Sequence, residues 1–237
     1  MARIWVGTSG FSYKEWRPAF YPAEVSDKAF LRYYATRFNS VEINSTFYRM
    51  PSAKTLEAWT SATGEDFRFT LKAPRRITHQ ERLRVPSEAL THLLDVVRAL
   101  GGRLGALLFQ LPPDFRRDVP RLDLFLSALP RGFPAAFEFR HASWFCPEVF
   151  DLLRKREVAL CARDADEGST PLEITAPFTC VRLRRSGYDK FQIEEWRRRF
   201  RGWAERGVDV FAYLKHEDNP DAPRIAGAFA EGLRAAG

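Results

Sequence analysis

Eight strand-like runs alternate with helical patterns along the chain, and this alternation constrains the fold more than any other feature. Strands separated by helices form βαβ units, whose strands lie parallel in one sheet. We therefore predict an α/β fold in which the strands close into a single (β/α)8 TIM-type barrel, with one domain over residues 1–237. The predicted strands are Ile4 to Gly7, Ser40 to Ser45, Phe67 to Lys72, Leu104 to Leu111, Ala135 to Arg140, Val158 to Arg163, Cys180 to Arg184 and Val208 to Lys215.

An open, doubly wound sheet is the alternative for parallel strands. A closed barrel is favoured because the strands are evenly spaced and no Gly-rich GxGxxG turn follows the first one. The length of 237 residues is also close to the ~250 residues typical of such barrels. The segment from Asp164 to Pro177 is rich in Asp, Gly, Ser, Thr and Pro, so we predict a loop in place of the sixth helix.

Cysteine content and hydropathy point to a cytoplasmic protein without a membrane partner. Cys146, Cys161 and Cys180 show no CxxC spacing, so neither a disulfide framework nor a zinc site is indicated. The first residues read directly into a strand, and no apolar run approaches ~18 residues. We therefore expect no signal peptide and no transmembrane helix, and the pattern leaves the oligomeric state open.

The formal net charge is +7, which allows a polyanionic partner such as nucleic acid. The densest basic run, residues 197–199 with Arg201, lies on a predicted helix whose other face carries Trp196, Phe200 and Trp203. A charged run opposite an apolar stripe is typical of a solvated helix face. The charge surplus therefore favours an ordinary basic surface over a dedicated nucleic-acid site.

Polar residues occupy alternate positions near the C-terminal ends of the predicted strands. In the second strand, Glu42 and Asn44 alternate with Val41 and Ile43. Because successive side chains of a strand point to opposite faces, and barrel active sites lie at the C-terminal mouth, we expect these groups to converge there. The polar groups at the other strand ends are Lys72, Gln110, Glu138, Arg140, Asp164 and Arg182.

Burying one such charge without a partner would cost several kcal/mol, which leaves two interpretations. The charges pair with one another in a structural network, or they bind and transform a polar ligand. On the second interpretation, the candidate catalytic acids and bases are Glu42, Glu138, Asp164 and His141. The candidate substrate-binding residues are the cations Lys72, Arg140 and Arg182, together with Asn44, Gln110 and His79.

Aromatic residues are concentrated in the loops that follow the strands. We predict that Trp16, Tyr48 and Trp144 form a wall of the pocket, with packing inside the loops as the alternative. His216, like His79 and His141, is a candidate acid or base, although a single histidine of this kind is more often structural.

No cofactor is predicted. A divalent metal held by Glu42, Glu138, Asp164 and a histidine is the alternative, and the interleaved cations argue against it. The sequence has no GxSxG elbow, Walker loop or HExxH motif.

Several motifs resemble the DUF72 family, also called YecE-like. They are Gly7 to Tyr13, Val41 to Tyr48 (VEINSTFY), Gln110 to Pro113, Glu138 to Trp144 (EFRHASW) and Val181 to Leu183. The resemblance runs from about residue 3 to 230 and implies a TIM-barrel fold without an established activity. A distant likeness of such proteins to endonuclease IV-type barrels implies nucleic-acid binding by analogy. Many members carry Gly after Arg-Leu-His in the seventh loop, whereas Arg184 to Gly187 follow Leu183 here.

The leading functional hypothesis is an enzyme of the hydrolase or lyase type. Its substrate would be a small polar or anionic molecule, with phosphorylated compounds among the candidates, bound in the charged mouth of the barrel. Two alternatives remain open, a nucleic-acid-binding or phosphodiester-processing protein and a non-catalytic ligand sensor.

Overall fold

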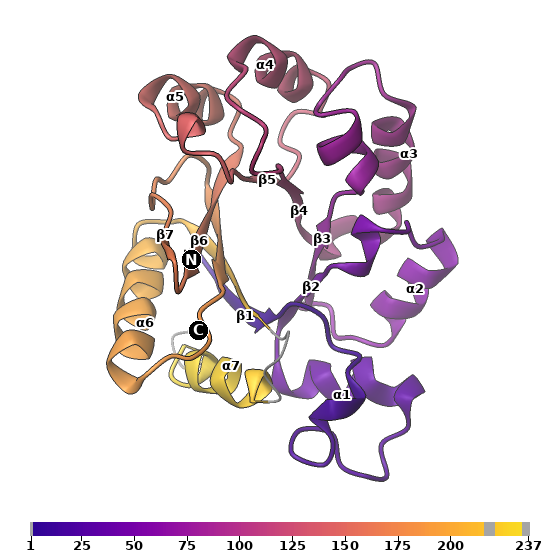
Figure 1. Cartoon of the computed structure of the whole chain (residues 1–237). Coiled ribbons are helices and arrows are strands. Elements are labelled where there is room, and N and C mark those ends of the chain that lie inside the picture. The colour runs from indigo at the N-terminus through magenta and orange to yellow at the C-terminus, as the bar shows by residue number, and fades with distance from the viewer. Residues whose placement is uncertain (1, 216–220, 234–237) are drawn as a thin grey trace.

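The chain forms a nearly closed barrel of parallel strands surrounded by helices (Figure 1). The computed structural model describes residues 2–215 and 221–233. The strand order β1-β9-β8-β6-β5-β4-β3-β2 confirms the predicted (β/α)8 architecture and each of its eight strands. Their bounds are β1 Ile4–Thr8, β2 Ser40–Ile43, β3 Arg68–Lys72, β4 Leu104–Gln110, β5 Ala135–Glu138, β6 Ala159–Ala165, β8 Phe178–Leu183 and β9 Asp209–Leu214.

The helices form a ring outside the barrel (Figure 1). They are α1 Phe30–Arg37, α2 Ala53–Ser61, α3 Glu88–Val97, α4 Val119–Ser127, α5 Pro147–Lys155, α6 Lys190–Glu205 and α7 Ala222–Ala230. No α-helix separates β6 from β8 in this fully described segment. The short strand β7, Gly168–Ser169, turns back there and pairs antiparallel with β6, so the predicted loss of the sixth helix is confirmed. In the part of the chain that the structure describes, no helix has both the length and the apolar character to cross a bilayer.

Capping side chains fix where several helices begin. The hydroxyl of Ser87 accepts a hydrogen bond from the Leu90 N–H at the start of α3, and Ser52 does the same for Thr55 in α2. Asp118 caps α4 in the same way. Each cap satisfies a backbone donor that the first helical turn would leave without an acceptor.

Apolar residues fill two separate layers. The larger core lies between the strands and the helices, and the smaller one fills the barrel interior. In the interior, Trp5 and Phe211 stack with ring centroids 4.7 Å apart. Above them, the hydroxyl of Tyr213 bonds to Ser40 Oγ and Thr70 Oγ1, each at 2.7 Å. Side chains therefore fill the barrel interior below the C-terminal ends of the strands.

The seam between β1 and β2 is closed largely by side chains instead of a regular ladder. Asn39 accepts from the Val6 N–H and donates to the Ile4 carbonyl, each at 2.9 Å. The Tyr34 hydroxyl accepts from the Thr8 N–H at 2.8 Å and donates to a carbonyl of β2. The first backbone pairing comes only at the mouth, where the Gly10 N–H donates to the Glu42 carbonyl at 2.7 Å. This seam brings the loop after β1 against the end of β2.

Candidate functional site

A pocket of about 510 Å³ opens at the C-terminal ends of the strands. Its position follows from its lining, because Lys72 ends β3, Gln110 ends β4 and Lys215 directly follows β9. The volume lies within the range of small-molecule sites. The complete lining is Tyr13, Asn44, Ser45, Phe47, Tyr48, Lys72, Gln110, Arg140, Arg163, Asp166, Glu167, Arg182, Arg184 and Lys215.

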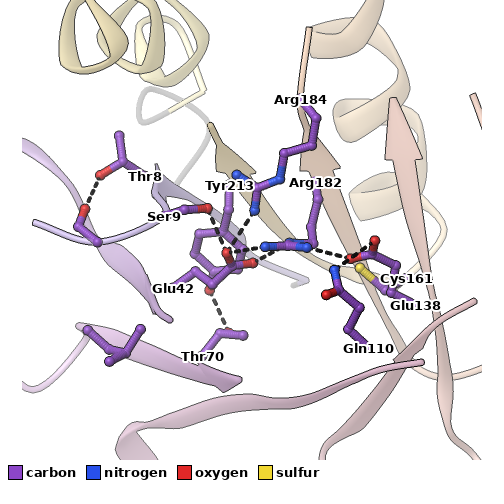
Figure 2. Close-up of polar contacts among 12 residues, drawn as sticks. Thr8, Ser9, Glu42, Thr70, Gln110, Glu138, Cys161, Arg182, Arg184 and Tyr213 are labelled. Carbon is purple, nitrogen blue, oxygen red and sulfur yellow. Dashed lines mark hydrogen bonds and ion pairs between the residues drawn. The ribbon is translucent and has the colours of Figure 1, made fainter. Parts of the chain in front are cut away.

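The floor of the pocket is a buried ion-pair cluster centred on Arg182 (Figure 2). From β8, this guanidinium reaches two glutamates on separate strands. Its Nε and Nη2 donate to the two carboxylate oxygens of Glu42 at 2.7 and 2.8 Å. Its Nη1 donates to Glu138 Oε2 at 2.6 Å. The alternation of strand residues therefore does bring Glu42, Glu138 and Arg182 together at one mouth.

Neighbouring side chains complete the hydrogen bonding of both carboxylates. Ser9 Oγ donates to Glu42 Oε1 at 2.6 Å, and Arg184 Nη2 donates to the same oxygen at 2.8 Å (Figure 2). Gln110 Nε2 donates to Glu138 Oε1 at 3.1 Å. Arg140 also binds that oxygen through Nε. Both glutamates are fully buried, so these contacts replace the water that the charges lost.

These contacts keep both glutamates ionised at neutral pH. Burial by itself raises the pKa of a carboxyl group, but the charges of Arg182 and Arg184 outweigh burial and hold the pKa of Glu42 far below its usual range. For Glu138, Arg182 and Arg140 overcome burial and lower the pKa to about 2. A carboxylate with such a low pKa is a weak base and is not protonated at pH 7, so the geometry favours a positioning role over proton transfer.

Lys72 is placed differently from the arginines. Its ammonium nitrogen lies 4.1 Å from the centroid of the Phe47 ring. Among the described residues, no carboxylate lies within ion-pair distance of this amine. Burial and then the nearby charge of Arg182 lower the pKa of Lys72 to about 8. Lys72 therefore loses its proton at a lower pH than an ordinary lysine does.

Further cations surround the opening. Arg163 reaches it from β6 and pairs with Glu167, while Arg140, Arg184 and Lys215 come from the ends of three other strands. Within the described residues, Asn44 Oδ1 and Arg163 Nε are buried and have no protein hydrogen-bond partner. Such atoms need a partner from solvent or a ligand, and both belong to residues that line the pocket.

The prediction that Asp164 lies at the pocket is wrong. Arg163 is the register partner of Arg182 and shares its inward face, so Asp164 points outward. Its carboxylate accepts hydrogen bonds from Trp196 of α6, Arg185 and Tyr188. These contacts tie the end of β6 to the helix layer.

The prediction that Trp16 and Trp144 wall the pocket is also wrong. Their exposed fractions are 1% and 0%, and neither contributes to the lining. Trp16 packs against Tyr21, and Trp144 stacks on Phe139 with ring centroids 4.7 Å apart. Large aromatic rings gain most by leaving water, which is why these loop residues joined the core. Tyr48 does line the pocket and is 82% exposed.

None of the histidines that the structure describes lines the pocket. His141 Nδ1 accepts from the Ser143 N–H and so caps a short 3-10 turn, which does not support its predicted catalytic role. His79 packs edge-on against Phe47, with ring centroids 5.0 Å apart, and bonds to Thr78. His79 therefore packs against Phe47, a lining residue, without lining the pocket itself. His216 lies outside the described residues.

The carboxylates proposed for the alternative metal site do not come together. Arg182 lies between Glu42 and Glu138, and Asp164 is on the opposite face of β6. No cluster of three His, Cys, Asp or Glu side chains suited to a metal occurs within residues 2–215 and 221–233.

Several lining residues are not among the predicted site residues. They are chiefly Arg163, Arg184 and Lys215 among the cations and the acidic pair Asp166 and Glu167. Arg163 could have been found. Its alternation with the outward residues Leu160 and Ala162 on β6 assigns it to the inward face. The acidic pair belongs to the β6–β7 turn, whose course no strand pattern predicts.

Comparison with known proteins agrees with this architecture. The UPF0759 protein YecE of Escherichia coli K12 is 39% identical over 116 residues, which are 48% of this chain and 43% of that relative, so the match spans less than half of YecE. The UPF0759 protein YunF of Bacillus subtilis is 24% identical over 92% of this chain and 90% of its own length.

Solved structures show the same fold. A DUF72 family protein from Thermotoga maritima has a TM-score of 0.81 at 25% identity, covering 98% of this chain and 99% of its own. A second, from Enterococcus faecalis, has a TM-score of 0.77 at 18% identity, covering 99% of this chain and 96% of its own. The family model described as protein of unknown function DUF72 matches residues 5–237, so the chain belongs to the DUF72 family.

Proposed function

We propose that the pocket at the barrel mouth binds a small anionic compound and that the protein acts on it as an enzyme of the hydrolase or lyase type. The observation that carries this proposal is the charge of the lining. Six cationic side chains line the pocket against two acidic ones, Asp166 and Glu167. With the two buried glutamates beneath them included, cations still exceed acids by two (six minus four).

The ion-pair cluster supports binding by fixing Arg182. Because two carboxylates hold the Arg182 guanidinium, its orientation is fixed and its positive charge stays at the floor of the pocket. Three other cations lie at the opening, namely Arg140, Arg163 and Lys215. Among the described residues, none of the three is paired with two carboxylates as Arg182 is. Phosphate and carboxylate groups are the ligands that guanidinium groups recognise best.

The two lining atoms without a protein hydrogen-bond partner set a second requirement for the ligand. Asn44 Oδ1 needs a donor and Arg163 Nε needs an acceptor. A ligand hydroxyl group offers the donor that Asn44 Oδ1 lacks, and a ligand anion offers the acceptor that Arg163 Nε lacks. We therefore favour hydroxylated phosphates or carboxylates over simple inorganic ions as the natural ligand class.

Calorimetric titration tests the binding step with inorganic phosphate and malonate as probes. We expect saturable binding to the wild-type protein and about tenfold weaker binding to Arg163→Gln, equivalent to about 1.4 kcal/mol. Arg131→Gln removes the same charge from an exposed site outside the pocket and should leave the affinity unchanged. Equal loss in both variants, or no saturable binding to the wild-type protein, would contradict the proposal.

Two other outcomes would identify the alternative functions. Binding of a single-stranded oligonucleotide that weakens steeply with salt and is insensitive to Arg163→Gln would favour a nucleic-acid surface outside the pocket. Saturable anion binding without turnover of any bound hydroxylated phosphate or carboxylate would favour a ligand sensor.

A further inference from the structure

One lining residue has the properties of a nucleophile. Lys72 ends β3 and projects from the inward face at the pocket, two residues beyond Thr70 on the same strand. It is half-buried and rests against the Phe47 ring at 4.1 Å. The other lysine of the lining, Lys215, directly follows β9 on the other side of β1 and β2.

The surroundings of Lys72 disfavour its charged form. The nearest carboxylates, Glu42 and Glu138, are both engaged by Arg182. Among the described residues, no acid forms an ion pair with the Lys72 amine. Burial and the charge of Arg182 outweigh the opposite effect of Glu42 and Glu138, and the pKa of Lys72 falls to about 8. A substantial fraction of neutral amine is therefore present near pH 7.5, as nucleophilic attack requires.

We propose that Lys72 forms a Schiff base with the aldehyde or ketone carbonyl of a small anionic compound bound in the pocket. The inference deepens the proposed function, on which it rests, and selects its lyase branch. The neutral amine attacks the carbonyl carbon, a C–N bond forms, and the carbonyl electron pair moves to oxygen. One proton moves from the nitrogen to this oxygen and a second comes from solvent. The C–O bond then breaks, the oxygen leaves as water, and the nitrogen lone pair completes the C=N bond of a cationic imine.

The rest of the pocket fits this chemistry. Arg182 and Arg140 lie close enough to affect the charge of Lys72, so they can hold a carboxylate or phosphate beside the reacting carbonyl. The cationic imine draws electrons from the adjacent carbon–carbon bond, which is the step that lyases of this kind exploit. Gln110, whose Nε2 binds Glu138, also lines the pocket.

Reductive trapping tests the inference directly. The full-length protein is incubated with pyruvate or with dihydroxyacetone phosphate in the presence of sodium cyanoborohydride, and modified lysines are located by peptide mass mapping. With at least one probe, we expect Lys72 to be modified at least about tenfold faster than the exposed Lys54 and Lys155, because its pKa is lowered and it lies in the pocket that binds the anion. Inorganic phosphate should slow this modification by competition.

Variants and an uncharged ketone, acetone, distinguish a failure of the Schiff-base inference from a failure of the anion-binding proposal. Lys72→Arg should abolish the fast modification, and Lys54→Arg should leave it unchanged. If neither probe modifies Lys72 faster than the exposed lysines, the Schiff-base inference is wrong even where calorimetry shows phosphate binding. If acetone and pyruvate modify Lys72 equally fast and phosphate does not compete, the amine is reactive but the anion-binding proposal is wrong.

Discussion

Arg182 binds Glu42 through a bidentate ion pair, with 2.7 Å from Nε to Oε2 and 2.8 Å from Nη2 to Oε1. The two side chains are 6% and 0% exposed. Burying such a pair gains little net free energy, because desolvation offsets most of the attraction. Removing one partner is different, since it leaves the other charge largely buried and without its main counter-charge.

Replacing Glu42 by Gln should therefore destabilise the protein. The variant leaves Arg182 with one carboxylate and removes one charged acceptor of Arg184, so we expect the free energy of unfolding to fall by about 3–5 kcal/mol. Denaturant unfolding measures this loss. Glu167→Gln is the control, because Glu167 is 68% exposed in its pair with Arg163 and its loss should have little effect. Similar small effects of both variants would mean that the cluster does not stabilise the fold.

The pH dependence of stability should reflect Glu138. Its pKa is about 2 in the folded protein, against about 4.3 for an unfolded glutamate. The folded state therefore binds fewer protons between these values, and the resulting stabilisation is present above about pH 4.3 and is lost as the pH falls toward 2. Unfolding measured from pH 7 to 3 should show a shallower decline for Glu138→Gln than for the wild-type protein. Glu57→Gln, at an exposed helical site, should follow the wild-type curve, and parallel curves for all three would contradict the assignment.

Replacing Lys72 by Met should raise the thermal stability at pH 7. In the folded protein the ammonium group is partly desolvated and lies near Arg182, so its charge opposes folding. Methionine keeps most of the side-chain volume and removes that charge, at the loss of the contact with Phe47. Lys54→Met, at an exposed site, is the control and should change the melting temperature little. A lower melting temperature for Lys72→Met alone would show that the amine stabilises the fold.

The alternation of strand residues predicted the centre of the site but not its edges. Glu42, Glu138 and Arg182 each sit within a strand, where the two-residue period fixes the facing of every side chain. Asp164 lies near a strand end, but its alternation with Arg163 places it on the outward face. Trp16 and Trp144 lie in loops, where no period exists and burial decides the orientation.

The pairing within the cluster could not have been predicted from the sequence. Three acidic and three basic side chains at strand ends allow many pairings, and one arginine serves both glutamates here. That choice depends on the distance across the barrel and on the reach of a side chain from β8. It also changes the chemical assignment, since paired glutamates with lowered pKa values leave Lys72 as the group suited to react.

The close approach of β1 and β2 at the seam requires a glycine at position 7. A Cβ atom added at Gly7 would lie 1.9 Å from the Ser40 carbonyl oxygen and 2.9 Å from the Tyr34 hydroxyl. No side-chain rotation can relieve a clash with backbone, so Gly7→Ala must push the two strands apart and break the contacts through Tyr34. We expect a loss of at least about 3 kcal/mol in the free energy of unfolding, comparable with other severe packing defects.

Gly102→Ala is the matched control for this substitution. A Cβ atom at Gly102 meets no other atom within 4 Å, and its backbone is outside the left-handed region. Replacing that glycine should leave stability unchanged or raise it slightly, because alanine has less conformational freedom in the unfolded chain. Because the seam also carries Ser9 to its hydrogen bond with Glu42, Gly7→Ala should weaken phosphate binding as well. A stable Gly7→Ala variant with wild-type phosphate affinity would show that the close approach of β1 and β2 is not needed to form the pocket.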